Sequence, residues 1–250
     1  MAIFIKSEKE INGIRKSGRI VAKTLKLIEA EISEGKSLEQ LEQTCIKIIT
    51  GENAKPAFLG YRGFPKAVCI SVNDEVVHGI PNGRKLKNGD IVKIDVGVYK
   101  DGLYADGARS FRVGNISQTL ENLVTTTEQS LNLGIDQARA DNRISDISHT
   151  IQDYVEAKGF SVIRELSGHG VGVQLHEEPS VPNFGKPGRG IKLVTGMTLA
   201  IEPMVNLGTY DVWTDANGWT VKTCDGKASA HFEHTILVTK SEPEILTRLD

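Results

Sequence analysis

The stretch that decides the fold is IVKIDVGVYKDGLYADGARSFRV, residues 91–113. Its first part, residues 91–99, is rich in β-branched residues and predicts a strand. Residues 100–102 (Lys-Asp-Gly) are typical of a tight turn, and residues 103–113 predict the returning strand. The stretch therefore predicts an antiparallel hairpin.

An aspartate in the middle of this apolar strand needs an explanation. Burying the charge of Asp95 costs several kcal/mol unless another group compensates it. With a two-residue loop at 100–101, Tyr99 pairs with Gly102 and Asp95 stands opposite Asp106; a loop shifted by one or two residues leaves the two acids neighbours. Carboxylates about 5 Å apart repel each other, and a shared cation turns that repulsion into binding. The alternative is a pair of solvent-facing hairpin acids.

Outside the hairpin the chain alternates helices and strands. Ser7 with Glu10, and Ser37 with Gln40, form two capping boxes, each followed by apolar residues at helical spacing, ending at Ile28 and Ile48. Further helices are predicted over 118–136 and 145–158, and further strands over 67–72, 160–163, 198–205 and 231–239. Two successive units of helix, helix, strand and hairpin predict an α+β fold with internal pseudo-symmetry. We expect one domain over 1–250, with halves of approximately 7–114 and 118–239.

Two more acids lie in apolar strands. Glu202 lies in TLAIEPMV (198–205) and Glu233 in HFEHTILVT (231–239). Either one alone is typical of a surface or ion-paired residue. Four carboxylates on the strands of one small fold instead indicate an oxygen-rich site for divalent ions, and a pair of such ions is a hydrolytic device.

The histidines divide into two groups. His169 in SGHGVG (167–172) is framed by glycines, which permit the close approach of a ligand, and His78 and His176 lie at strand or loop ends. We expect His149, His231 and His234 to be structural or surface residues. The common zinc-helix, nucleophile-elbow and phosphate-loop motifs are absent from the sequence.

The composition excludes several classes of protein. The chain has 250 residues, 39% hydrophobic and 25% charged, with a formal net charge of −2, which gives no reason to expect binding to nucleic acid. Three scattered cysteines fit a reducing compartment. Because the sequence contains no signal-peptide core and no apolar stretch of about 20 residues, we expect a cytoplasmic protein that does not enter the membrane.

Five segments resemble the type I methionine aminopeptidases of the pita-bread metallohydrolase family. They are residues 60–81, 93–111, 167–185, 197–204 and 231–239, in the family's order and spacing. The resemblance implies a pita-bread fold around a curved antiparallel sheet, and an enzyme that removes the initiator methionine from nascent proteins when the second residue is small. The expected partners are the N-terminal methionyl peptides of nascent chains, met at the ribosome, and we expect a monomer.

The resemblance also implies roles for individual residues. It assigns two divalent ions (Co, Mn, Fe or Zn) to five ligands, with two carboxylates bridging both ions. The ligands are Asp95, Asp106, His169, Glu202 and Glu233, of which Asp106 and Glu233 bridge. Glu202 is also the expected general base, and His78 and His176 match two catalytic histidines.

The substrate pocket follows from the same resemblance. Its expected lining comprises Phe58, Tyr61, Phe64, Cys69, His78, Leu175, His176 and Trp219. Aromatic and sulfur surroundings suit a thioether. Gly107 stands where a serine or threonine is common in the family.

Three other functions share some of these features. A proline-specific peptidase or creatinase has the same fold but usually carries an additional N-terminal domain, whereas the matching region here begins almost at once. A non-catalytic scaffold of this fold loses metal ligands, and this chain keeps all five. A two-metal phosphoesterase would need a basic cluster beside the carboxylates, and the sequence has none.

Overall fold

A computed structural model describes residues 3–249, so residues 1, 2 and 250 of the expected domain lie outside the described residues. The four α-helices are α1 (Glu8–Glu29), α2 (Leu38–Gly51), α3 (Gln118–Asp136) and α4 (Ile144–Ala157). Both predicted capping boxes are present, at Ser7 with Glu10 and at Ser37 with Gln40. The apolar stripe of α2 ends at Ile49, which is buried, and not at Ile48 as predicted, which is half-buried.

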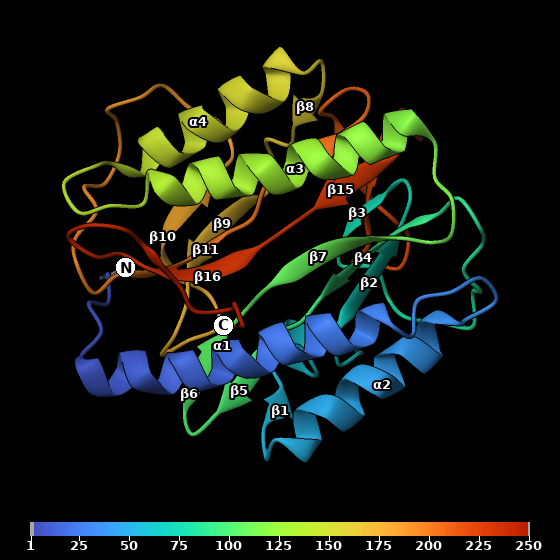
Figure 1. Ribbon diagram of the computed structural model, residues 1–250, viewed down its shortest axis with the longest axis horizontal. Coiled ribbons are helices and arrows are strands. Elements are labelled where there is room, and N and C mark those ends of the chain that lie inside the picture. Colours follow the sequence, from blue (N-terminus) through green and yellow to red (C-terminus); the bar gives the residue numbers. More distant parts are fainter. Residues whose placement is uncertain (1–2, 250) are drawn as a thin grey trace.

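The helices form two pairs, and each pair covers a core of its own. In Figure 1, α3 and α4 lie along the upper side of the strands and α1 and α2 along the lower side. Apolar residues of α1 and α2 pack mainly with the strands before residue 114, and those of α3 and α4 mainly with the strands after residue 160. None of the helices between residues 3 and 249 combines the length and apolar character needed to cross a membrane.

The strands pair antiparallel in five small sheets, which confirms the expected α+β class. One has the order β2 (Cys69–Val72), β4 (Ile91–Asp95), β7 (Ala108–Arg112), and a second β1 (Lys55–Pro56), β5 (Val98–Lys100), β6 (Leu103–Ala105). The largest has the order β10 (Glu177–Pro182), β9 (Ser167–Gly170), β11 (Thr198–Ile201), β16 (His234–Leu237), β17 (Glu244–Ile245). The other two are β15 (Ser229–His231), β12 (Met204–Asn206), β8 (Ser161–Val162), and β13 (Val212–Thr214), β14 (Val221–Thr223), β3 (Glu75–Val77). A short 3₁₀ helix, η1 (Tyr61–Gly63), precedes β2.

The loop of the first hairpin is shifted by one residue from 100–101, which is the alternative in which Asp95 and Asp106 remain neighbours. Tyr99 faces Tyr104 and not Gly102, so the two loop residues are Asp101 and Gly102. Both have positive φ, of 51° and 89°, which is the geometry that an Asp-Gly loop supplies with little strain. As a result Asp95 faces Ala108 across the ladder, and not Asp106.

Each long strand predicted around an acid is interrupted at that acid. The stretch 91–99 divides into β4 and β5 directly after Asp95, and 103–113 divides into β6 and β7 at Asp106. In the same way 198–205 is interrupted at Glu202, and 231–239 at Glu233. Glycine or proline adjoins three of these breaks, where regular pairing is weakest. Three of the carboxylates therefore lie in short irregular joints between strands, and Asp95 ends the strand that precedes the fourth joint.

At these joints the hairpin of residues 91–113 meets a second hairpin, formed by the paired segments 198–205 and 231–239. The backbone N–H of Glu233 donates to Ala108 O at 2.9 Å, and that of Ala108 donates to Glu233 O at 3.3 Å. Beside them, the N–H of Asp106 donates to Thr235 Oγ1 at 2.9 Å. This contact brings acids from the two halves of the chain to one place.

Candidate active site

Four acids and one histidine gather where the hairpins meet. Oxygen and nitrogen atoms of Asp106, His169 and Glu233 lie within 4.8 Å of one another. His169 lies on β9, opposite Ala200 of β11, and its Nε2 is 3.6 Å from Glu202 Oε1. The cluster thus contains acids from both hairpins and a histidine from a neighbouring strand.

The electrostatics of this cluster are unfavourable without a cation. Burial, together with the charge of neighbouring carboxylates, raises the pKa of Asp95, Glu202 and Glu233 well above the ordinary range. Burial also raises the pKa of Asp106 to about 7. Four buried acids that repel one another are stabilised when positive charge binds among them.

Unpaired atoms indicate where such a charge would bind. Asp95 Oδ1 and Glu233 Oε1 are buried and have no hydrogen-bond partner among residues 3–249. Burial lowers the pKa of His169 to about 4, so its ring is neutral and can offer a lone pair. Mixed carboxylate and imidazole donors of this kind fit a divalent metal ion.

A cavity of about 130 Å³ opens onto these five residues. Its wall includes seven of the eight predicted pocket residues, and the eighth, Leu175, is buried behind it against Phe58, Phe64 and Cys69. The seven are Phe58, Tyr61, Phe64, Cys69, His78, His176 and Trp219. The structure therefore brings every predicted site residue together, while the roles assigned to them stay predictions.

Ring contacts order the side chains of this wall. Tyr61 stacks on His176 with ring centroids 5.2 Å apart and planes 12° apart. The ring of His176 also lies 4.1 Å from that of His169. Trp219 meets Phe64 edge-on at 5.2 Å. One end of the cavity is aromatic and the other is lined by carboxylates and imidazoles.

Two residues near the cluster were missed by sequence reasoning. His231 is 1% exposed and its Nε2 lies 3.5 Å from Glu202 Oε2, so it belongs beside the site and not on the surface. Arg62 lines the cavity with a positive φ of 49°, and its guanidinium lies 5.3 Å from the centre of the Tyr61 ring. Arg62 could have been found from the sequence, because glycines flank the Tyr61-Arg62 pair just as they flank His169.

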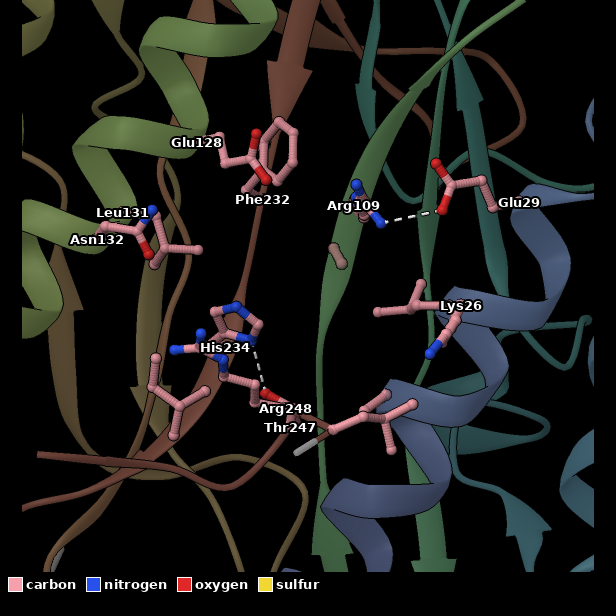
Figure 2. A pocket seen from close by; sticks show the side chains of 15 residues that line it. Lys26, Glu29, Arg109, Glu128, Leu131, Asn132, Phe232, His234, Thr247 and Arg248 are labelled. Carbon is pink, nitrogen blue, oxygen red and sulfur yellow. Dashed lines mark hydrogen bonds and ion pairs between the residues drawn. The ribbon is translucent and has the colours of Figure 1, made fainter.

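A larger cavity lies elsewhere. A groove of about 670 Å³ between α1 and α3 shares no residue with the site cavity. In Figure 2, Phe232 and His234 enter this groove, on either side of Glu233 in the chain. His234 Nδ1 is 2.8 Å from Thr247 Oγ1, which confirms the expected structural role of this histidine. Size alone does not identify the active site here, since the acid cluster opens into the smaller cavity.

Comparison with known proteins agrees with this geometry. Residues 12–240 match metallopeptidase family M24. The chain belongs to metallopeptidase family M24. A methionine aminopeptidase of Clostridium perfringens is 52% identical over 245 residues, which cover 98% of each chain. Methionine aminopeptidase 1 of Bacillus subtilis is 48% identical over 247 residues, covering 99% of this chain and all of that protein.

The fold of this M24 peptidase matches a solved structure closely. The crystal structure of methionine aminopeptidase from Thermotoga maritima superimposes with a TM-score of 0.98 at 46% identity, covering 99% of this chain and 100% of that one. The predicted pita-bread fold is confirmed. As an M24 metallopeptidase with a buried Asp, His and Glu cluster, the protein is a hydrolase with a site suited to divalent metal.

Proposed function

We propose that this M24 peptidase is a methionine aminopeptidase, which removes the N-terminal methionine from nascent proteins when the second residue is small. The observation that carries this proposal is the acid and histidine cluster at the floor of an aromatic cavity. Full-length similarity to relatives that bear the name methionine aminopeptidase supports it. The cluster supplies hydrolytic chemistry, and the cavity selects the first residue.

The five residues of the cluster would hold two divalent ions. Asp106 and Glu233 would serve as ligands to both ions, Asp95 to one of them, and His169 with Glu202 to the other. When bound, such ions polarise carbonyl oxygens and lower the pKa of water from 15.7 toward about 7. Mn(II), Fe(II), Co(II) and Zn(II) all suit these donors, and availability decides among them.

Glu202 is placed to move the proton. It lies in the joint between β11 and β12, with one carboxylate oxygen 3.6 Å from His169 and the other 3.5 Å from His231. A carboxylate at this position takes a proton from the attacking water and returns it to the leaving amine. The imidazole of His231 lies beside the second oxygen.

His176 and His78 serve the substrate. The Nδ1 atom of His176 has no partner in the described part of the chain, and burial lowers the pKa of this residue to about 3. A neutral imidazole in this place donates a hydrogen bond to the carbonyl oxygen as negative charge develops on it. His78, which lines the same cavity, holds the substrate amide. His176→Ala should therefore lower kcat far more than it raises KM.

The aromatic end of the cavity provides selectivity. Tyr61, Phe64 and Trp219 with Cys69 offer polarisable walls to an unbranched thioether. A charged first residue would lose its hydration there without gaining a group of opposite charge. A β-branched first residue would be too wide for the space between these side chains. The requirement for a small second residue rests on family resemblance.

We also propose where the enzyme acts, its oligomeric state and its domain organisation. We expect a cytoplasmic monomer that forms one catalytic domain from residue 1 to 250, with halves of approximately 7–114 and 118–239. Its substrates are nascent chains as they leave the ribosome. Contributions to one site from both hairpins support the single domain, because neither half carries the complete ligand set.

The decisive experiment compares metal content with cleavage of tripeptides. Protein stripped with a chelator should be inactive on Met-Ala-Ser, and Mn(II) or Co(II) should restore cleavage. In the series X-Ala-Ser and Met-X-Ser, methionine should be required first and a small residue second. Cleavage of Xaa-Pro bonds whatever the first residue would assign the chain to the proline peptidases. No cleavage by metal-loaded protein would favour a scaffold, and full activity in verified metal-free protein would refute the metal mechanism.

A further inference from the structure

The loop between β9 and β10, residues 171–176, carries two residues of the proposed site. Leu175 packs behind the cavity and His176 lines it. The loop has no regular secondary structure. Its backbone is fixed in part by a bond from the Tyr104 N–H to Gly172 O at 2.8 Å. Another group must therefore fix the part of the loop that lies next to His176.

Glu177 supplies that support. Its Oε1 accepts two hydrogen bonds from the loop backbone, from the N–H of Val173 at 2.6 Å and of Gln174 at 2.8 Å. The side chain is 0% exposed. One carboxylate oxygen therefore fixes the backbone of the two residues that directly precede Leu175 and His176.

Lys6 supplies the opposite charge from a distant part of the chain. Its Nζ pairs with Glu177 Oε2, and the lysine side chain is 1% exposed. Lys6 is itself fixed, since its N–H donates to Gly196 O at 2.9 Å and its Nζ to Phe4 O at 3.2 Å. A Cβ at Gly172 would lie 3.0 Å from Lys6 Cε, so the lysine stem packs against the loop backbone. The N-terminal segment is thereby tied to the active-site loop.

The imidazole of His176 depends on this support because few contacts hold the ring itself. Its Nδ1 has no hydrogen-bond partner within residues 3–249, and its contacts are ring contacts with Tyr61 and His169. No side chain therefore fixes the ring by a directional bond to that nitrogen. Its direction follows from the loop backbone and from stacking.

We propose that Glu177 and Lys6 are positioning residues for catalysis: the Glu177 carboxylate fixes the loop that aims His176 at the substrate carbonyl, and Lys6 pairs with that carboxylate and keeps it in place. This inference rests on the proposed function for the role of His176. The competing explanation is that the ion pair only stabilises the fold. A buried carboxylate that loses its cation is strongly destabilising, so single substitutions cannot separate the two explanations.

Two double variants separate them. In Lys6→Met/Glu177→Gln the charges are removed, but the amide oxygen can still accept both loop N–H bonds. In Lys6→Met/Glu177→Leu the charges are removed and the acceptor is lost, while an apolar pair fills the space. Apolar replacement of a buried ion pair is often neutral for stability. Both proteins should fold and bind the same amount of Mn(II).

The kinetics on Met-Ala-Ser should then differ. We expect the glutamine variant to retain kcat within about threefold, and the leucine variant to lose about 10- to 100-fold in kcat with little change in KM, as for a misplaced catalytic group. The exposed pair Lys23 and Glu52 provides the control, because Lys23→Met/Glu52→Leu removes an ion pair without touching the loop. A folded, metal-loaded leucine variant with the kcat of the unmodified protein would overturn the proposal.

A second measurement does not depend on activity. In protein labelled with ¹⁵N-histidine, the ring signals of His176, identified by their loss in His176→Ala, should shift in the leucine variant and not in the glutamine or control variants. Unshifted signals in the leucine variant would refute the positioning role. If the unmodified protein cleaves no methionyl peptide, the proposed function fails, and these signals still decide whether Glu177 orients the ring.

Discussion

Removing one carboxylate from the acid cluster should stabilise the protein when no metal is bound. Burial raises the pKa of Asp106 from an ordinary 3.8 to about 7. At about 1.4 kcal/mol for each pKa unit, this difference corresponds to roughly 4 kcal/mol. Between these values the folded protein holds a proton that the unfolded chain has released, so stability falls as the pH rises from about 4 to about 7. Above pH 7 the whole cost of the charge is present.

Asp106→Asn removes this charge and keeps an oxygen that can accept the hydrogen bond from the Gly107 N–H. In chelator-treated protein at pH 8, we expect the free energy of unfolding to rise by up to about 4 kcal/mol, and at pH 4 to change little. Urea denaturation at both pH values measures this. Asp101→Asn, at the exposed loop of the same hairpin, is the matched control.

Divalent metal should reduce the stability difference between the two proteins. Ions at 100 times their dissociation constant stabilise the unmodified protein by about 2.7 kcal/mol, and the variant that has lost a shared ligand gains much less. An Asp106→Asn protein that is no more stable than the unmodified one, without metal at pH 8, would refute the argument that burying the charge of Asp106 is costly.

Three further outcomes are expected. Glu202→Gln should lose at least about 10²-fold in kcat on Met-Ala-Ser, as for a general base, and near-normal turnover would remove Glu202 from that role. Norleucine should be a fair substitute for methionine as first residue, because a hydrophobic pocket discriminates one methylene by only about 1–3 kcal/mol, as kcat/KM on norleucyl peptides would measure. Gly18→Ala should cost about 1–3 kcal/mol in thermal unfolding, since its Cβ would lie 2.2 Å from the backbone oxygen of Leu246. Gly13→Ala in the same helix meets only the movable end of the Leu103 side chain and should be nearly neutral; equal costs would contradict the packing argument.

The candidate site is predictable from the sequence to a large extent. Aspartate and glutamate inside apolar strands are costly, and this cost is a local signal that singles out Asp95, Asp106, Glu202 and Glu233. Helix starts are equally readable, since a capping box at Ser7 is a local signal that tertiary contacts did not override. The ring contacts within the pocket, by contrast, join segments that are distant in the chain.

The sequence by itself determined the elements and the residues able to do chemistry, because strand and helix periodicity, turn residues and charge in apolar segments are all properties of near neighbours. Only the tertiary structure decided that the loop of the first hairpin is shifted by one residue, and that four predicted strands are interrupted at their acids. It alone placed His231 against Glu202, and Lys6 against Glu177. These depend on which distant segments pack together, since Glu233 meets Ala108 only when both hairpins are folded. Long-range packing is the sum of many weak contacts, and no short stretch of sequence encodes it.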